Sequence, residues 1–105
     1  MPDLAIEIDK AKLRDFCQRW KITEFALFGS VTRPAEFRAD SDVDVLVRFA
    51  EGTPWTLFDF VHAQDELAEL FGRPVDLVER DAVEQSDNRF RKRAILNSVV
   101  LLDVA

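Results

Sequence analysis

Helix-forming and strand-forming segments alternate along the chain, and this alternation is the feature that most limits its fold. Apolar residues recur at helical spacing in residues 10–20, 57–71 and 88–97. Between them lie short runs rich in valine, leucine or phenylalanine, at residues 25–28, 43–49, 75–79 and 99–102. Elements in this order predict an α/β or α+β protein, with a small mixed sheet and helices packed on one face.

Local signals mark the ends of the predicted helices. Asp9 is placed to cap the first helix, in which Leu13 and Phe16 lie on one apolar stripe. The second helix ends where Gly72 is followed by Pro74. The third is expected to be a basic amphipathic helix built around an apolar set, namely Phe90, Ala94 and Ile95.

Size and composition narrow the class of protein. A chain of 105 residues, 48% of them hydrophobic, is long enough for one core, so we expect one domain over residues 1–105. No apolar run approaches the roughly 18 residues that span a bilayer, and the start of the sequence, MPDLAIEIDK, is acidic. We therefore expect a cytoplasmic protein without a membrane partner.

The balance of charge argues against a dedicated nucleic-acid binder. Twenty acidic residues outnumber fourteen lysines and arginines, for a formal net charge of −6. This sign opposes broad attraction to nucleic-acid phosphates. The single cysteine, Cys17, falls on the apolar side of the first helix, where a free thiol usually behaves as a small hydrophobe.

Two aspartates open the segment at residues 43–49. Asp42 and Asp44 are two residues apart, and because strand side chains alternate, both carboxylates should share the face opposite the valines. Arg48 shares their face by the same parity, which would let it approach substrate phosphates. Two like charges this close are costly without a cation. The pattern predicts a site for Mg²⁺, which binds one or two carboxylates together with substrate phosphates.

A glycine–serine turn ends the preceding strand. Gly29 lets the backbone approach a ligand closely, and consecutive N–H groups in such a turn bind phosphate. Ser30 adds a hydroxyl donor. Because a short connection returns the chain to the aspartate strand, we expect the turn and the carboxylates to share one open cleft.

A third aspartate lies within the apolar run at residues 75–79. Asp76 would be costly to bury without a partner, and the bland interpretation places it in water on an edge strand. We favour a strand parallel to residues 43–49, which puts Asp76 beside the aspartate pair and provides three carboxylates for two metal ions. Asp76 would then complete the second metal site or accept a hydroxyl proton.

The glycine–serine turn and the aspartate pair occur in one segment, GSVTRPAEFRADSDVDVLV, which resembles the signature of the minimal nucleotidyltransferases of the DNA polymerase β-like superfamily. The resemblance covers nearly the whole chain and implies the nucleotidyltransferase fold. It implies that ATP is the substrate, that a turn binds its triphosphate, and that a separate site holds two Mg²⁺ ions. The nucleotide-binding residues would be Gly29, Ser30 and Arg33, and the catalytic and metal-binding residues Asp42, Asp44 and Asp76.

Domains of this kind resemble the antitoxins of two-gene modules, whose partner is an all-helical HEPN-domain ribonuclease toxin. The resemblance implies a protein adenylyltransferase that transfers AMP from ATP to a tyrosine of the toxin and neutralises it. Two alternatives stay open: an antitoxin that masks its toxin sterically without catalysis, and an enzyme that modifies a small-molecule hydroxyl. The intact carboxylates argue against the first alternative.

Overall fold

A four-stranded mixed sheet forms the centre of the molecule in the computed structural model, which describes residues 6, 8–38, 41–97 and 99–102. The strands lie in the order β3-β2-β1-β4. Their bounds are β1 Ile22–Phe28, β2 Val43–Phe49, β3 Val75–Glu79 and β4 Val100–Leu102. β1 runs antiparallel to β2 and β4, whereas β2 and β3 run parallel. The mixed sheet confirms the predicted fold class.

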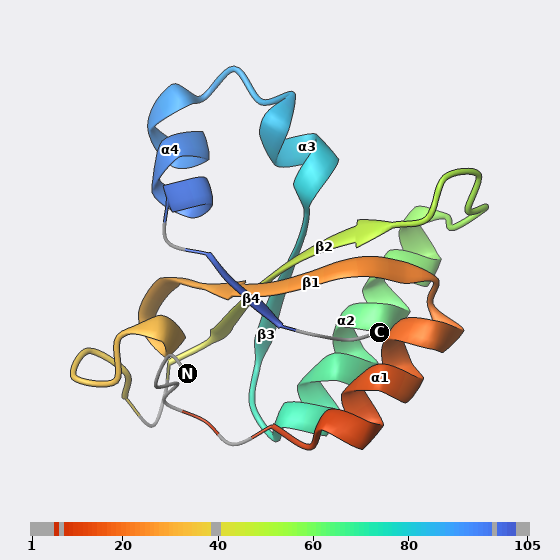
Figure 1. The fold of residues 1–105 in the computed structure, drawn as a ribbon, viewed down its shortest axis with the longest axis horizontal. Helices are drawn as coiled ribbons and strands as arrows, with labels where there is room; N and C mark the ends of the chain where they lie inside the picture. The colour runs from red at the N-terminus through yellow and green to blue at the C-terminus, as the bar shows by residue number, and fades with distance from the viewer. Residues whose placement is uncertain (1–5, 7, 39–40, 98, 103–105) are drawn as a thin grey trace.

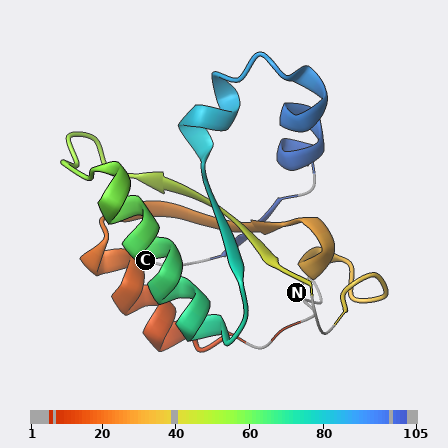
Figure 2. The same ribbon diagram turned by 180° about the vertical axis from the view of Figure 1, so that it is seen from behind.

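The predicted helices α1 (Lys10–Arg19) and α2 (Leu57–Phe71) lie side by side against one face of this sheet (Figures 1 and 2). Asp9 caps α1 as expected, because its carboxylate accepts the backbone N–H of Lys12. α2 begins with a capping box between Thr56 and Asp59, which the sequence reasoning did not identify. It ends at Gly72, whose φ of 70° is left-handed. Such caps typically stabilise a helix by about 1 kcal/mol each.

The main apolar core fills the space between the sheet and these two helices. Val43, Val45 and Val47 point into it and are buried, as strand parity predicted. Leu13 and Phe16 of α1 meet them from the helical side. Cys17 belongs to the same core, and burial raises the pKa of its thiol to about 12, so it packs as an apolar side chain.

Two further helices, α3 (Arg80–Glu84) and α4 (Arg89–Asn97), lie on the opposite side of the sheet from α1 and α2 (Figure 1). A second, smaller cluster joins them to the sheet and consists of Ala26, Phe28, Leu46, Val83 and Ile95. The sequence analysis placed helices on one face only, and α3 was not predicted. This second layer of helices packs on the same face of the sheet that carries Asp44.

The interpretation of α4 was partly wrong. Ile95 is buried, but Phe90 is 90% exposed and Ala94 is also exposed. A helix turns by roughly 100° per residue, so Phe90 lies about 140° around the axis from Ile95 and cannot share its face. The short α4 buries one narrow stripe, and its remaining surface faces outward.

Of the helices that the structure describes, none combines the length and the apolar character needed to cross a membrane.

Candidate functional site

The parallel pairing of β2 with β3 brings two of the three predicted carboxylates together. Asp44 lies directly opposite Asp76 in the register of these strands, as the sequence analysis predicted. Asp44 is half-buried, whereas Asp76 is exposed. Asp42 stands just before β2 and is also exposed. We refer to Asp42, Asp44 and Asp76 as the carboxylate site.

Gly29 ends β1 directly beside this site. The last residue of β1, Phe28, pairs with Asp44 across the antiparallel strands. Gly29 has a φ of 75°, and a Cβ atom placed on it would lie 2.2 Å from Oδ2 of Asp44. Glycine therefore suits the left-handed backbone here, and a larger residue would have to displace the carboxylate of Asp44.

The chain continues from Gly29 into the 3₁₀ turn η1 (Gly29–Thr32). Thr32 Oγ1 donates a hydrogen bond to the Gly29 carbonyl at 2.7 Å, and the Arg33 N–H donates to the Ser30 carbonyl at 2.9 Å. Ser30 lies half-buried in this turn. These local bonds hold the turn at the edge of the carboxylate site.

The carboxylates of the site carry negative charge that the nearby arginine offsets only in part. The pKa of Asp44 is raised, first by burial and then by the negative charges of Asp76 and Asp42. Arg33 opposes this shift but only in part. The guanidinium of Arg33 is exposed and forms an ion pair with Glu36. Its predicted contact with nucleotide remains a prediction.

Comparison with known proteins decides the family. The family described as "Nucleotidyltransferase domain" matches residues 10–102. The chain belongs to the nucleotidyltransferase domain family. The protein adenylyltransferase MntA of Thermococcus cleftensis is 36% identical over 74 residues, which are 70% of this chain and 72% of that protein.

Solved structures support the same fold. A protein assigned as a minimal nucleotidyltransferase superposes with a TM-score of 0.67 and 32% identity, covering 89% of this chain and 88% of that one. A second match is to one chain of a complex between a tri-AMPylated HEPN toxin of Shewanella oneidensis and an MNT antitoxin. Its TM-score is 0.51 at 14% identity, covering 89% of this nucleotidyltransferase and 71% of that chain, so it supports the fold alone.

The carboxylate site of this nucleotidyltransferase has the chemistry that suits a hard cation. Its donors are all carboxylate oxygens, and burial, followed by the charges of Asp76 and Asp42, raises the pKa of Asp44 despite the opposing charge of Arg33. Within the described ranges, however, no three His, Cys, Asp or Glu side chains are already gathered closely enough to hold a metal ion. The donor set therefore fits Mg²⁺ bound by one or two carboxylates together with phosphate oxygens, as is usual for this ion.

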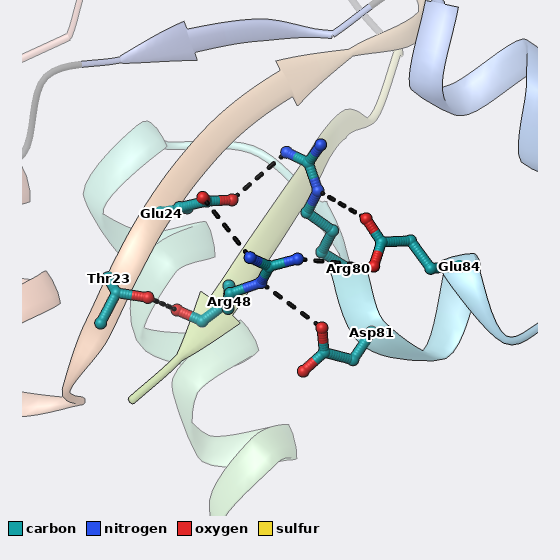
Figure 3. Close-up of polar contacts among 6 residues, drawn as sticks. All are labelled: Thr23, Glu24, Arg48, Arg80, Asp81 and Glu84. Carbon is teal, nitrogen blue, oxygen red and sulfur yellow. Dashed lines mark hydrogen bonds and ion pairs between the residues drawn. The ribbon is translucent and has the colours of Figure 1, made fainter. Parts of the chain in front are cut away.

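Arg48 does not approach this site as parity suggested. It lies in a charged cluster at the other end of β2, in which three carboxylates outnumber two arginines but each carboxylate contacts an arginine. We call it the balanced cluster for these contacts, and it consists of Glu24, Arg48, Arg80, Asp81 and Glu84 (Figure 3). Arg48 Nε is buried and faces Asp81 Oδ1 at 3.4 Å, without hydrogen-bond geometry. Its other nitrogens reach Glu24 at 3.7 Å and Glu84 at 3.4 Å.

Arg80 completes the balanced cluster. It contacts Glu24 at 3.2 Å and Glu84 at 3.2 Å, the second across one turn of α3. The pairing of Arg80 with Glu84 could have been read from their spacing of four residues. The contacts of Arg48 with Glu24 and Asp81 had no comparable signal, because they join separate segments of the chain.

Proposed function

We propose that this nucleotidyltransferase is a cytoplasmic antitoxin that transfers AMP from ATP to a tyrosine of a HEPN-type ribonuclease partner and thereby neutralises it. The observation that carries the proposal is the meeting of Asp44, Asp76 and Gly29 at one edge of the sheet. The MntA relative, which is named a protein adenylyltransferase, supports the choice of a protein acceptor.

In the proposed reaction, a tyrosine hydroxyl attacks the α-phosphorus of ATP in line with the departing pyrophosphate. One P–O bond forms to the acceptor, one breaks, and the hydroxyl proton is lost. Mg²⁺ at the carboxylate site would supply Lewis-acid stabilisation of the attacking and leaving oxygens. Asp42 and Asp44 would hold the metal ions, and Asp76 would hold the second ion or accept the proton.

The turn at Gly29 and Ser30 has a separate part in this proposal. Its backbone approaches Asp44 so closely that a triphosphate held by the turn would also lie against the metal-binding oxygens. Arg33, one turn further along, would add positive charge toward the phosphates. Such positioning is the main contribution a protein makes to phosphoryl and nucleotidyl transfer.

The decisive experiment incubates the protein, Mg²⁺ and labelled ATP with the product of the neighbouring gene. The chain contains no tyrosine, so label on tyrosine can only be on the partner. We expect this label, a matching gain of AMP mass and loss of the partner's ribonuclease activity. The Asp44→Asn variant is the control and should leave the partner unlabelled.

Each other result has a defined meaning. Neutralisation of the partner by wild-type and Asp44→Asn protein alike, without label, would favour steric masking over catalysis. Label that appears only on a small molecule would favour the drug-modifying type of activity. Either result would contradict the proposed protein adenylyltransferase, while the membership of the nucleotidyltransferase family would stand.

A further inference from the structure

A small pocket lies between α3 and α4 on the same face of the sheet as the carboxylate site. Asp76 and Val78 are two residues apart in β3 and therefore point to one face. Their partners across the parallel pairing are Asp44 and Leu46. The pocket has a volume of about 120 Å³ and is lined by Val78, Ala82, Val83, Ser86, Arg91, Lys92 and Ile95.

Packing and one hydrogen bond hold the two helical walls of this pocket together. Val83 of α3 and Ile95 of α4 are buried in the second apolar cluster against Leu46 of β2. The Lys92 ammonium donates to the Glu84 carbonyl at 2.7 Å and so ties α4 to α3. Buried apolar side chains thus form the base of the pocket, and its two helical walls are fixed to each other.

Arg91 stands at the rim of the pocket with its charge uncommitted. Several arginines of the described residues form no ion pair, Arg93 of the same helix among them, but Arg91 is the one of the two that lines the pocket. In the portion of the chain that the structure describes, the Arg91 guanidinium has no hydrogen-bond or ion-pair partner, although the protein is strongly acidic. It is exposed, so its planar face is free to cover a ring in the pocket.

We propose that this pocket, with Arg91 at its rim, binds the nucleobase of the nucleotide whose triphosphate lies at the carboxylate site. The inference rests on the proposed use of ATP. Along β3, Val78 lies roughly 6.6 Å beyond Asp76, which leaves room for a ribose between base and phosphates. The pocket volume of about 120 Å³ is below the roughly 150 Å³ of a dry cavity that encloses benzene, so the pocket would hold one edge of the base and leave the rest of its bicyclic ring outside, under Arg91. Arg91 would stack on that ring.

The test compares two ligands that share phosphates and differ in the base. ATP and inorganic tripolyphosphate are titrated with Mg²⁺ into wild-type protein, Arg91→Ala and Arg93→Ala. Arg93 is the matched control, because it is an exposed arginine of the same helix that does not line the pocket. We expect Arg91→Ala to weaken ATP binding about tenfold, with tripolyphosphate binding unchanged. Arg93→Ala should leave both affinities unchanged.

A second variant tests the pocket without removing a charge. Ala82 lines the pocket from the exposed side of α3, so Ala82→Phe should fill it without disturbing the core. We expect this variant to lose affinity for ATP but not for tripolyphosphate. Unchanged ATP binding by both variants would overturn the inference, as would equal losses for the two ligands. Asp44→Asn should weaken both ligands. Wild-type protein that binds neither would refute the ATP proposal itself and this inference with it.

Discussion

Two charged clusters share one face of β2 and differ in how their charge is compensated. Asp44 belongs to the carboxylate site and Arg48 to the balanced cluster. They are four residues apart on one strand, or about 13 Å. Among the described residues, Arg33 is the one cation that lowers the pKa of Asp44. In the balanced cluster, by contrast, every carboxylate contacts at least one of two arginines.

The difference separates a cluster whose ion pairs join elements of the fold from a site that we propose binds a cation. The balanced cluster joins β1, β2 and α3 through ion pairs within the protein, although Arg48 Nε makes no hydrogen bond among the described residues (Figure 3). At the carboxylate site, Asp44 is half-buried, and the described residues do not fully offset the negative charges of Asp76 and Asp42. Burial first, and then these charges, raise the pKa of Asp44. Such uncompensated charge destabilises the free protein, and a bound cation would relieve that destabilisation.

The largest effect should follow from removing charge at the carboxylate site. The double variant Asp42→Asn with Asp44→Asn keeps the side-chain volume and removes the metal-binding charge. We expect loss of about 3 kcal/mol or more of transition-state stabilisation, roughly a hundredfold or more in transfer rate. Thermal unfolding should show no loss of stability, because like-charge repulsion is relieved. Near-normal transfer by a folded double variant would contradict the metal-dependent mechanism.

The next largest effect should separate close approach from backbone strain. Gly29 and Gly52 have similar φ values, 75° and 77°, but only at Gly29 would a Cβ meet another atom, Asp44 Oδ2. Both Gly→Ala changes should cost about 1 to 2 kcal/mol of unfolding free energy from the left-handed backbone. Gly29→Ala should cost more and also weaken ATP binding. If ATP titration and melting give equal results for the two variants, Gly29 has no special relation to the site.

A smaller effect should come from binding of Mg²⁺ at the carboxylate site. Mg²⁺ at about ten times its Kd should stabilise the wild-type protein by roughly 1.4 kcal/mol, because it binds the folded state alone. The shift should vanish in the Asp42→Asn, Asp44→Asn double variant and persist in Arg48→Met. Equal stabilisation of all three proteins would show that Mg²⁺ acts elsewhere. Thermal melts with and without Mg²⁺ provide the measurement.

The smallest effect should come from unbalancing the other cluster. Arg48→Met keeps an apolar stem but leaves Glu24 and Glu84 with Arg80 alone and removes the arginine that contacts Asp81. We expect a loss of about 1 kcal/mol of unfolding free energy, as for other partly exposed ion pairs, and a smaller loss at high salt. ATP binding should be unchanged. Arg93→Met, an exposed arginine outside the cluster, is the control. A large loss of ATP affinity in Arg48→Met would show that the balanced cluster also contributes to nucleotide binding.

Much of the local structure could be predicted because its causes lie within a few residues of each other. The predicted bounds of β2, α2 and β3 agree with the structure, since alternating valines, helical periodicity and Gly72 are short-range signals. The pairing of Asp44 with Asp76 was also predicted, from the cost of a lone carboxylate in an apolar strand. The roles of these residues in binding and catalysis remain predictions.

Only the tertiary structure decided how the distant segments share the second face of the sheet. α3 is one turn and a half of helix with a weak sequence signal, and it is held by packing of Val83 and by the balanced cluster. Phe90 points outward because α4 docks through Ile95, and Arg48 contacts carboxylates from other elements rather than the carboxylate site. Sequence periodicity determines which side of an element is apolar, but contacts between elements far apart in the chain depend on how those elements pack.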